Sequence, residues 1–74
     1  MVQRPPAGSI PITPGSYQFK DEQGGVIYVG KAVNLRSRVG SYFADPQTLH
    51  PRTAKMMSVA TTVEWIEVRN EVEA

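Results

Sequence analysis

The sequence contains no cysteine and a single histidine among its 74 residues. A disulfide framework and a Cys/His zinc knuckle are therefore excluded. A chain of this length makes one small domain, which buries only about 60% of the surface that its unfolded chain exposes. Because neither disulfides nor zinc can cross-link the chain, stability must come from packing or from a partner.

Long hydrophobic runs are also missing. The longest run, Val26 to Val29, is far shorter than the roughly 20 residues of a membrane helix. Residues 1–10 contain no apolar core of the kind that signal peptides carry. We therefore expect no membrane partner and no export, and a cytoplasmic location, with which the absence of cysteine is compatible.

Acidic residues are missing from one part of the chain. None occurs between Gln23 and Ala44, where Lys31, Arg36 and Arg38 lie. The last dozen residues have the opposite bias, because they contain glutamate at four positions and a single arginine. This asymmetry favours an anionic partner on a basic face, although ordinary solvated surface charge produces the same pattern.

Prolines divide the chain into two parts. Pro5, Pro6 and Pro11 exclude a helix or a central strand near the start, so we predict a proline-rich arm over residues 1–13 and a folded domain over 14–74. Within that domain, residues 16–20 and 26–30 have the composition of strands, and residues 21–25 have that of a turn. This pattern predicts a β-hairpin.

Two helices and a third strand are predicted after the hairpin. The first helix has Asn34 as its N-cap and packs one apolar stripe on the hairpin. The residues of that stripe are Leu35, Val39, Tyr42 and Phe43. A second helix begins at Pro51 and runs to about Val59, with Met56 and Met57 on its buried side. Residues 61–68 are rich in Thr, Val, Trp and Ile, which is typical of a strand.

The end of the sequence has the pattern of a helix start. Asn70 followed by Glu71 and Glu73 resembles a capping box, yet only one turn follows before Ala74. Since one turn does not nucleate a helix alone, we expect a truncated third helix. The sheet would then expose apolar surface and self-associate through it. The residues expected on that surface are Val63, Trp65 and Val68.

Five side chains of related chemistry lie on the hairpin and the first helix. They are Tyr17, Tyr28, Lys31, Arg38 and Tyr42. If the hairpin pairs the first two tyrosines, both phenols leave one face of the sheet, and the helix brings Arg38 and Tyr42 over them. An arginine fork, a lysine charge and phenol hydroxyls all suit an anionic oxygen substrate. We therefore predict that the five surround one shallow cleft.

Other interpretations of these residues are weaker. Strand aromatics usually serve packing, and a basic helix face is usually solvated, but the shared spacing favours a site. Gly25, Gly30 and Lys31 have the spacing of a P-loop. Ala32 stands where that motif needs Ser or Thr, and residues 26–29 form a strand instead of an open loop. No Ser/His/Asp triad can be assembled.

These motifs together resemble the GIY-YIG nuclease family, most closely its UvrC branch, over residues 12–74. The matching segments are Pro14 to Tyr17, Val26 to Ala32, Asn34-Leu35, Arg38-Val39, Ser41 to Phe43, His50 to Thr53 and Asn70 to Ala74. The resemblance implies a small α/β fold in which helices flank a three-stranded antiparallel sheet. Ser16 departs from the small apolar residue usual in the first triplet, at a position that is structural in the family.

The resemblance also implies a chemistry, namely hydrolysis of one DNA phosphodiester with a divalent metal, Mg or Mn. In the UvrC branch this is the incision 3′ to a lesion during nucleotide excision repair. By motif position, Tyr28 would accept the proton of the attacking water and Arg38 would stabilise charge on the phosphate. Tyr17, Lys31 and Tyr42 complete the catalytic set. The residues expected to contact DNA are Lys31, Arg36 and Arg38.

Two further expectations concern the metal and the partners. The family's metal ligand is a glutamate about one turn beyond Ala74, so Glu71 and Glu73 are not assigned to it, and the 74-residue chain is expected to be inactive. The implied partners are DNA and, through other parts of a longer protein, the damage-recognition subunit UvrB. Two alternatives stay open: a nucleic-acid-binding module without catalysis, and a fragment that docks on a protein partner.

Overall fold

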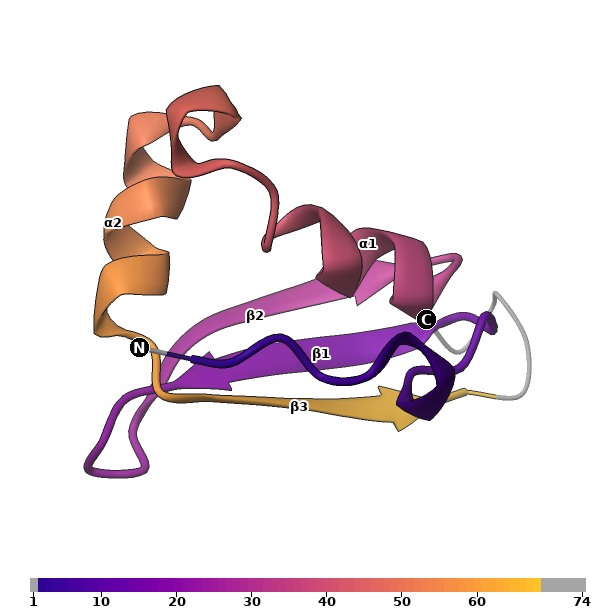
Figure 1. Ribbon diagram of the computed structural model, residues 1–74. Helices are drawn as coiled ribbons and strands as arrows, with labels where there is room; N and C mark the ends of the chain where they lie inside the picture. The colour runs from indigo at the N-terminus through magenta and orange to yellow at the C-terminus, as the bar shows by residue number, and fades with distance from the viewer. Residues whose placement is uncertain (1, 69–74) are drawn as a thin grey trace.

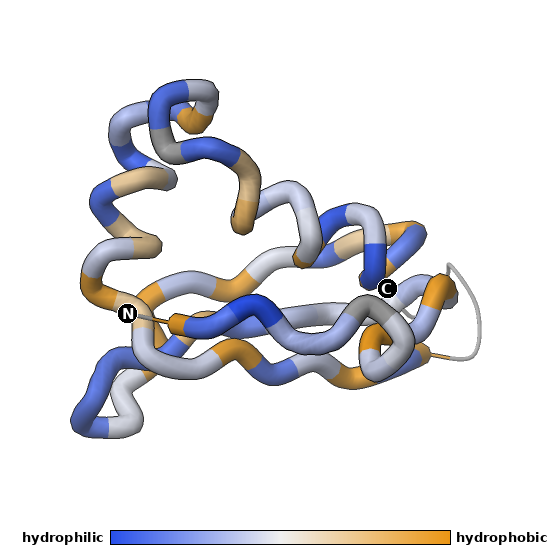
Figure 2. The backbone as a smooth tube through the Cα atoms, viewed as in Figure 1, coloured by the Kyte–Doolittle hydropathy of each residue, from blue (hydrophilic) through white to orange (hydrophobic). Residues whose placement is uncertain are grey.

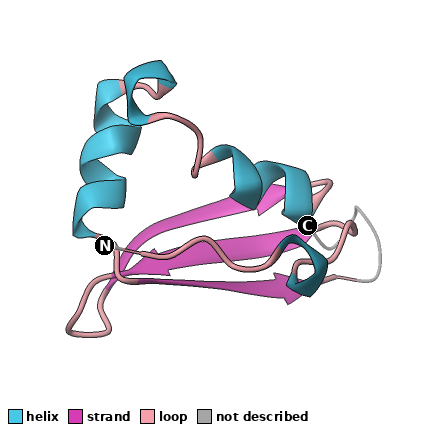
Figure 3. Cartoon of the chain, viewed as in Figure 1, coloured by secondary structure: helices cyan, strands magenta, loops and turns pink. Residues whose placement is uncertain are grey.

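The computed structural model describes residues 2–68, which form a three-stranded sheet with its helices over one face (Figure 1). The elements are η1 (Ala7–Ser9), β1 (Gly15–Lys20), β2 (Val26–Ala32), α1 (Leu35–Ser41), η2 (Pro46–Thr48), α2 (Pro51–Val59) and β3 (Thr62–Glu67), where η marks a 3-10 turn (Figure 3). β1 is the central strand, and β2 and β3 pair with it antiparallel. The predicted α/β fold is confirmed. The proposed capping box at Asn70 lies outside the described residues.

The turn of the hairpin is built by one aspartate and one glycine. The Asp21 carboxylate accepts hydrogen bonds from the backbone N–H groups of Gln23 and Gly25, at 3.0 and 2.9 Å. Gly24 has a φ of 81°, a conformation that residues with a Cβ rarely adopt. The local sequence therefore closes the hairpin, as predicted.

The register of the hairpin differs from the predicted one. Tyr17 lies opposite Gly30, and Tyr28 lies opposite Phe19, so the predicted Tyr17–Tyr28 pair is wrong. The actual pairing is offset by two positions, and the register shifts again after Phe19. Because side chains alternate with a period of two, this offset leaves both tyrosines on the same face.

Helix α1 is shorter than its apolar stripe. Asn34 caps it as predicted, since its Oδ1 accepts from the Ser37 N–H at 3.0 Å. Leu35 and Val39 are fully buried. The helix ends at Ser41, but Tyr42 keeps αR dihedral angles and still packs on the core.

Helix α2 has the predicted span. His50 is its N-cap, with Nδ1 accepting from the Arg52 N–H at 3.1 Å, and Pro51 occupies the first helical position. Met57 is buried and Met56 is partly buried, as the sequence indicated. Within residues 2–68, neither helix has the length and hydrophobicity to span a membrane.

The proline-rich segment packs against the domain. Val2 and Ile10 belong to the hydrophobic core, with exposed fractions of 6% and 2%. The carbonyl oxygens of Thr13 and Pro11 accept from the first two N–H groups of α1, at 3.0 and 2.9 Å. The segment therefore satisfies backbone donors that a helix start leaves free. The boundary between arm and domain stays a prediction.

The prediction that Val63 and Trp65 form an exposed apolar surface on β3 is wrong. Val63 and Trp65 lie opposite Phe19 and Tyr17, on the face that carries the core, and both are partly buried against it. Ile66 lies on the other face and is 68% exposed. The strand therefore has hydrophobic residues on both faces, and its tube in Figure 2 shows both orange and blue stretches. Self-association of the chain stays a prediction.

Candidate active site

Three tyrosines from separate elements form one cluster on the helix-covered face. Tyr17 is on β1, Tyr28 is on β2, and Tyr42 follows α1. The ring centroids lie 6.2 Å apart for Tyr17–Tyr28, 5.6 Å for Tyr17–Tyr42 and 6.1 Å for Tyr28–Tyr42. The hydroxyl oxygens of Tyr17 and Tyr42 share a hydrogen bond of 2.7 Å. The predicted convergence of the tyrosines is confirmed.

The Tyr17 ring packs directly against Gly30. A Cβ at Gly30 would collide with the hydroxyl oxygen and the adjoining ring atoms of Tyr17. The phenol therefore lies against the bare backbone of β2, where it reaches Tyr42. Gly15 has a related role, because a Cβ there would collide with the carbonyl of Ile66 and meet Leu35 Cδ1 at 2.7 Å. Gly30 thus allows close packing at Tyr17, and Gly15 allows close packing between β1, β3 and α1.

Phe19 packs against two rings of the cluster. It was not among the predicted site residues. Its ring is fully buried, 5.0 Å from the Tyr42 ring and 6.2 Å from the Tyr17 ring, with edge-on geometry in both pairs. Such aromatic contacts restrict where the neighbouring rings can lie. The alternation of β1 could have identified it, because Phe19 is two residues after Tyr17 and so shares its face.

Burial raises the pKa of two of the three phenols. Desolvation raises the pKa of Tyr17, while the hydrogen bond with Tyr42 and the charge of Arg38 oppose the rise. Desolvation also raises the pKa of Tyr42, and there the hydrogen bond with Tyr17 adds to the rise. Tyr28 is 43% exposed, so it is the phenol most open to solvent. The cluster therefore joins two phenols with raised pKa values to a third that water reaches.

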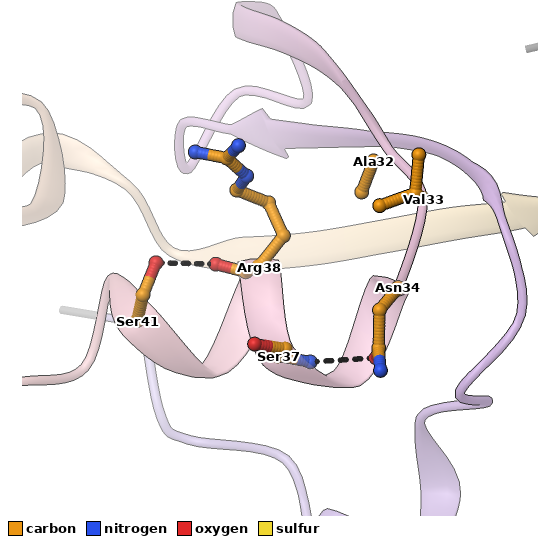
Figure 4. A pocket seen from close by; sticks show the side chains of 6 residues that line it. All are labelled: Ala32, Val33, Asn34, Ser37, Arg38 and Ser41. Carbon is orange, nitrogen blue, oxygen red and sulfur yellow. Dashed lines mark hydrogen bonds between the residues drawn. The ribbon is translucent and has the colours of Figure 1, made fainter.

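Arg38 lines a surface pocket and also lies within electrostatic reach of the tyrosines. Its charge acts on Tyr17, and its side chain also lines a pocket of about 290 Å³ (Figure 4). The remaining residues around this pocket are Ala32, Val33, Asn34, Ser37 and Ser41. Arg38 is exposed, and no ion pair involves it among the described residues. Its guanidinium is therefore free to bind an anion.

The other two predicted cations are placed differently. Lys31 lies opposite Ser16 on β1, one residue after Gly30 on β2. Because strand side chains alternate, this position faces away from the tyrosines, and Lys31 is exposed there. The Arg36 Nε donates to the Ile10 carbonyl at 2.8 Å, so this side chain also holds the N-terminal segment. Of the three cations, the structure brings Arg38 alone to the tyrosine face.

A metal site is not assembled by the described residues. Within residues 2–68, no group of three or more His, Cys, Asp or Glu side chains could hold an ion. The tyrosine cluster supplies phenols, and Arg38 adds a cation, which repels a divalent metal. Divalent metals such as Mg²⁺ prefer carboxylate ligands. These residues alone therefore do not fit a metal centre.

Comparison with known proteins identifies the family. The family model of the UvrC-like GIY-YIG domain matches residues 13–74. The chain is 63% identical over 71 residues to UvrABC system protein C of Parafrankia sp. and 59% identical to that of Corynebacterium diphtheriae. Each match covers 96% of this chain but only 10% of the relative. The chain thus spans about a tenth of the length of these relatives.

A solved structure shares both the fold and the sequence pattern. It is the GIY-YIG N-terminal endonuclease domain of UvrC from Thermotoga maritima, bound to magnesium as its catalytic divalent cation. It aligns with a TM-score of 0.77 and 37% identity, over 88% of this chain and 68% of that one. The tyrosine cluster, the two packed glycines and these matches agree, and the chain belongs to the UvrC-like GIY-YIG family.

Proposed function

We propose that this chain is the nuclease part of a DNA repair enzyme that hydrolyses a DNA phosphodiester. The observation that carries the proposal is the cluster of three tyrosines on one sheet face, with Arg38 beside it. Family membership supports it, because the related domain from Thermotoga maritima is described as an endonuclease. Phosphodiester hydrolysis requires a proton acceptor for water and positive charge for the phosphate.

The three phenols have different roles in this proposal. Tyr28 is the phenol that solvent reaches. In its phenolate form, which a nearby divalent cation would favour, it accepts the proton of the attacking water. Tyr17 and Tyr42 share one hydrogen bond and stay protonated at neutral pH. One hydroxyl proton serves that bond, which leaves the other able to donate to a phosphate oxygen. Arg38 stabilises the charge that develops on the phosphate.

The proposed activity requires parts beyond residues 2–68. We propose a divalent cation, Mg²⁺ or Mn²⁺, with its ligands outside the described residues, as the magnesium in the related domain supports. We also propose, as the family resemblance implies, that one ligand is a glutamate beyond Ala74, so that the 74-residue chain binds DNA without cutting it. Incision 3′ to a lesion, cooperation with UvrB and a cytoplasmic location complete the proposal, since the curated relatives belong to the UvrABC system. Lys31 and Arg36 would add DNA backbone contacts away from the tyrosines.

The test is Arg38→Ala in a chain extended to the length of its UvrC relatives. We expect cleavage of lesion-containing DNA in the presence of UvrA, UvrB and Mg²⁺ to fall about 100- to 1000-fold, as when a group that stabilises the transition state is lost. The thermal stability of the variant should hardly change, because Arg38 is exposed. A nicking assay and a melting curve measure the two effects.

The matched control is Arg52→Ala, which removes an exposed cation from α2. The control should retain cleavage. Equal cleavage by the Arg38 variant and its parent would contradict the proposal. If the extended parent binds DNA and never cuts it, the chain is a nucleic-acid-binding module instead.

A further inference from the structure

The pocket beside α1 shares Arg38 with the proposed reaction centre and adds polar side chains to which that centre gives no role. It lies between the end of β2, at Ala32 and Val33, and the flank of α1 (Figure 4). Its polar wall consists of Asn34, Ser37, Arg38 and Ser41, and no acidic residue lines it. One cation, two hydroxyls and an amide without a carboxylate suit an anionic oxygen ligand.

The free donors of this pocket are side chains. The first two N–H groups of α1 already bind carbonyls of the N-terminal segment, and the N–H of Ser37 binds Asn34. The Ser41 hydroxyl donates to the Arg38 carbonyl at 2.6 Å. The Ser37 hydroxyl makes no hydrogen bond with the described residues and is exposed. Ser37, Arg38 and the amide nitrogen of Asn34 are therefore the donors left to bind a ligand.

Arg38 connects this pocket to the proposed reaction centre. It lines the pocket, and its charge acts on Tyr17 in the cluster. A DNA strand bound with one phosphate at the tyrosines continues along its backbone, so its next phosphate needs a neighbouring site. Phosphate contacts of this kind fix the register of a protein on DNA without reading its bases.

We propose that the pocket beside α1 binds a second backbone phosphate of the cleaved DNA strand, with Ser37 as its hydrogen-bond donor. The inference rests on the proposed function, because it assumes a DNA strand at the tyrosine cluster. Ser37 is then a positioning residue that sets where the scissile phosphate lies. The ligand is an internal phosphodiester, and a free phosphate ion is the alternative source of the same chemistry.

The test is Ser37→Glu in the 74-residue chain, which places a carboxylate in the pocket. The helix should tolerate it, because position 37 is N3 of α1, where glutamate also completes a capping box with the N-cap. The probe is a fluorescent DNA duplex of about a dozen base pairs, titrated at several salt concentrations. We expect about tenfold weaker binding and a salt dependence reduced by about one phosphate contact.

The matched control is Gln23→Glu in the hairpin turn, at the far end of β2 from the pocket (Figure 1). It changes the net charge equally and should leave affinity within about twofold of the parent. If both variants weaken binding equally, net charge explains the effect and the pocket proposal fails. If Ser37→Glu binds like the parent while Arg38→Ala loses affinity, the pocket is unused but the proposed function stands. If the parent itself does not bind DNA, that result contradicts the proposed function, and the pocket proposal fails with it.

Inorganic phosphate separates the two sources of the ligand. It is titrated into isotope-labelled parent chain while the amide resonances of residues 34–41 are followed. Phosphate that shifts these resonances, together with DNA affinity equal in parent and Ser37→Glu, would assign the pocket to a free anion and overturn the proposal. Loss of DNA affinity in the variant supports the phosphodiester.

Discussion

The two faces of the sheet use neighbouring residues of the same strands for opposite purposes. On the inner face, Tyr17 and Phe19 of β1 are buried under the helices. On the outer face, Gln18 forms a long hydrogen bond of 3.3 Å to Glu64, and Lys20 pairs with that carboxylate at 2.5 Å, in contact with solvent. The same backbone thus presents a packed site on one side and exposed polar pairs on the other, because strand side chains alternate.

This difference explains how the side chains of the site are held in position. The tyrosines are held by burial, by ring contacts and by the absence of a side chain at Gly30. Among residues 2–68, nothing restrains the outer face comparably, since Val29 and Ile66 are more than half exposed. Catalytic and binding side chains must be held in fixed positions by packing, and the inner face provides that packing.

The largest expected effect is the loss of stability caused by a substitution on the inner face of the sheet. Phe19→Ala empties a fully buried ring position and should cost about 3–5 kcal/mol of unfolding free energy. A small domain has about 5–15 kcal/mol in total, so much of the margin would be lost. Urea denaturation followed by circular dichroism measures the change.

The outer-face control is Ile66→Ala, where the side chain is 68% exposed. Its unfolding free energy should stay within about 0.5 kcal/mol of the parent. Similar losses in both variants would show that the faces do not differ as the structure indicates.

A smaller effect is expected from Gly30→Ala. The added methyl group would collide with the Tyr17 ring, and overpacking of this kind costs about 1–3 kcal/mol. The tyrosine cluster should also rearrange, which near-ultraviolet circular dichroism detects. Gly8→Ala is the control, because a Cβ at Gly8 meets no atom within 4 Å. An unchanged tyrosine signal in the Gly30 variant would argue against the ring placement.

The smallest effect is a pH dependence of stability in alkali. Folding raises the pKa of Tyr17 and of Tyr42 above the ordinary value of 10.0, so the folded state holds these protons more tightly than the unfolded state. Their stabilisation is fully present below pH 10 and should decline as the pH rises beyond it. Tyr42→Phe should flatten this decline, as measured by urea midpoints over that range. A parent and variant with identical alkaline profiles would contradict the pKa directions.

Much of the fold was predictable because its signals are local. Asp21 to Gly25 close the hairpin, Asn34 caps α1, and Pro51 starts α2, each through contacts with residues a few positions away. The faces of the strands followed from alternation, so the three tyrosines were predicted together despite a wrong pairing.

The tertiary structure decided what depends on distant residues. It set Tyr17 opposite Gly30, turned Arg36 toward the N-terminal segment and placed Trp65 on the core-bearing face. It also left Lys31 on the face away from the tyrosines. These outcomes depend on strand register and long-range packing, which no short stretch of sequence encodes. By itself the sequence determined the elements, their caps and the chemistry of the site residues, whereas packing chose which of those residues meet.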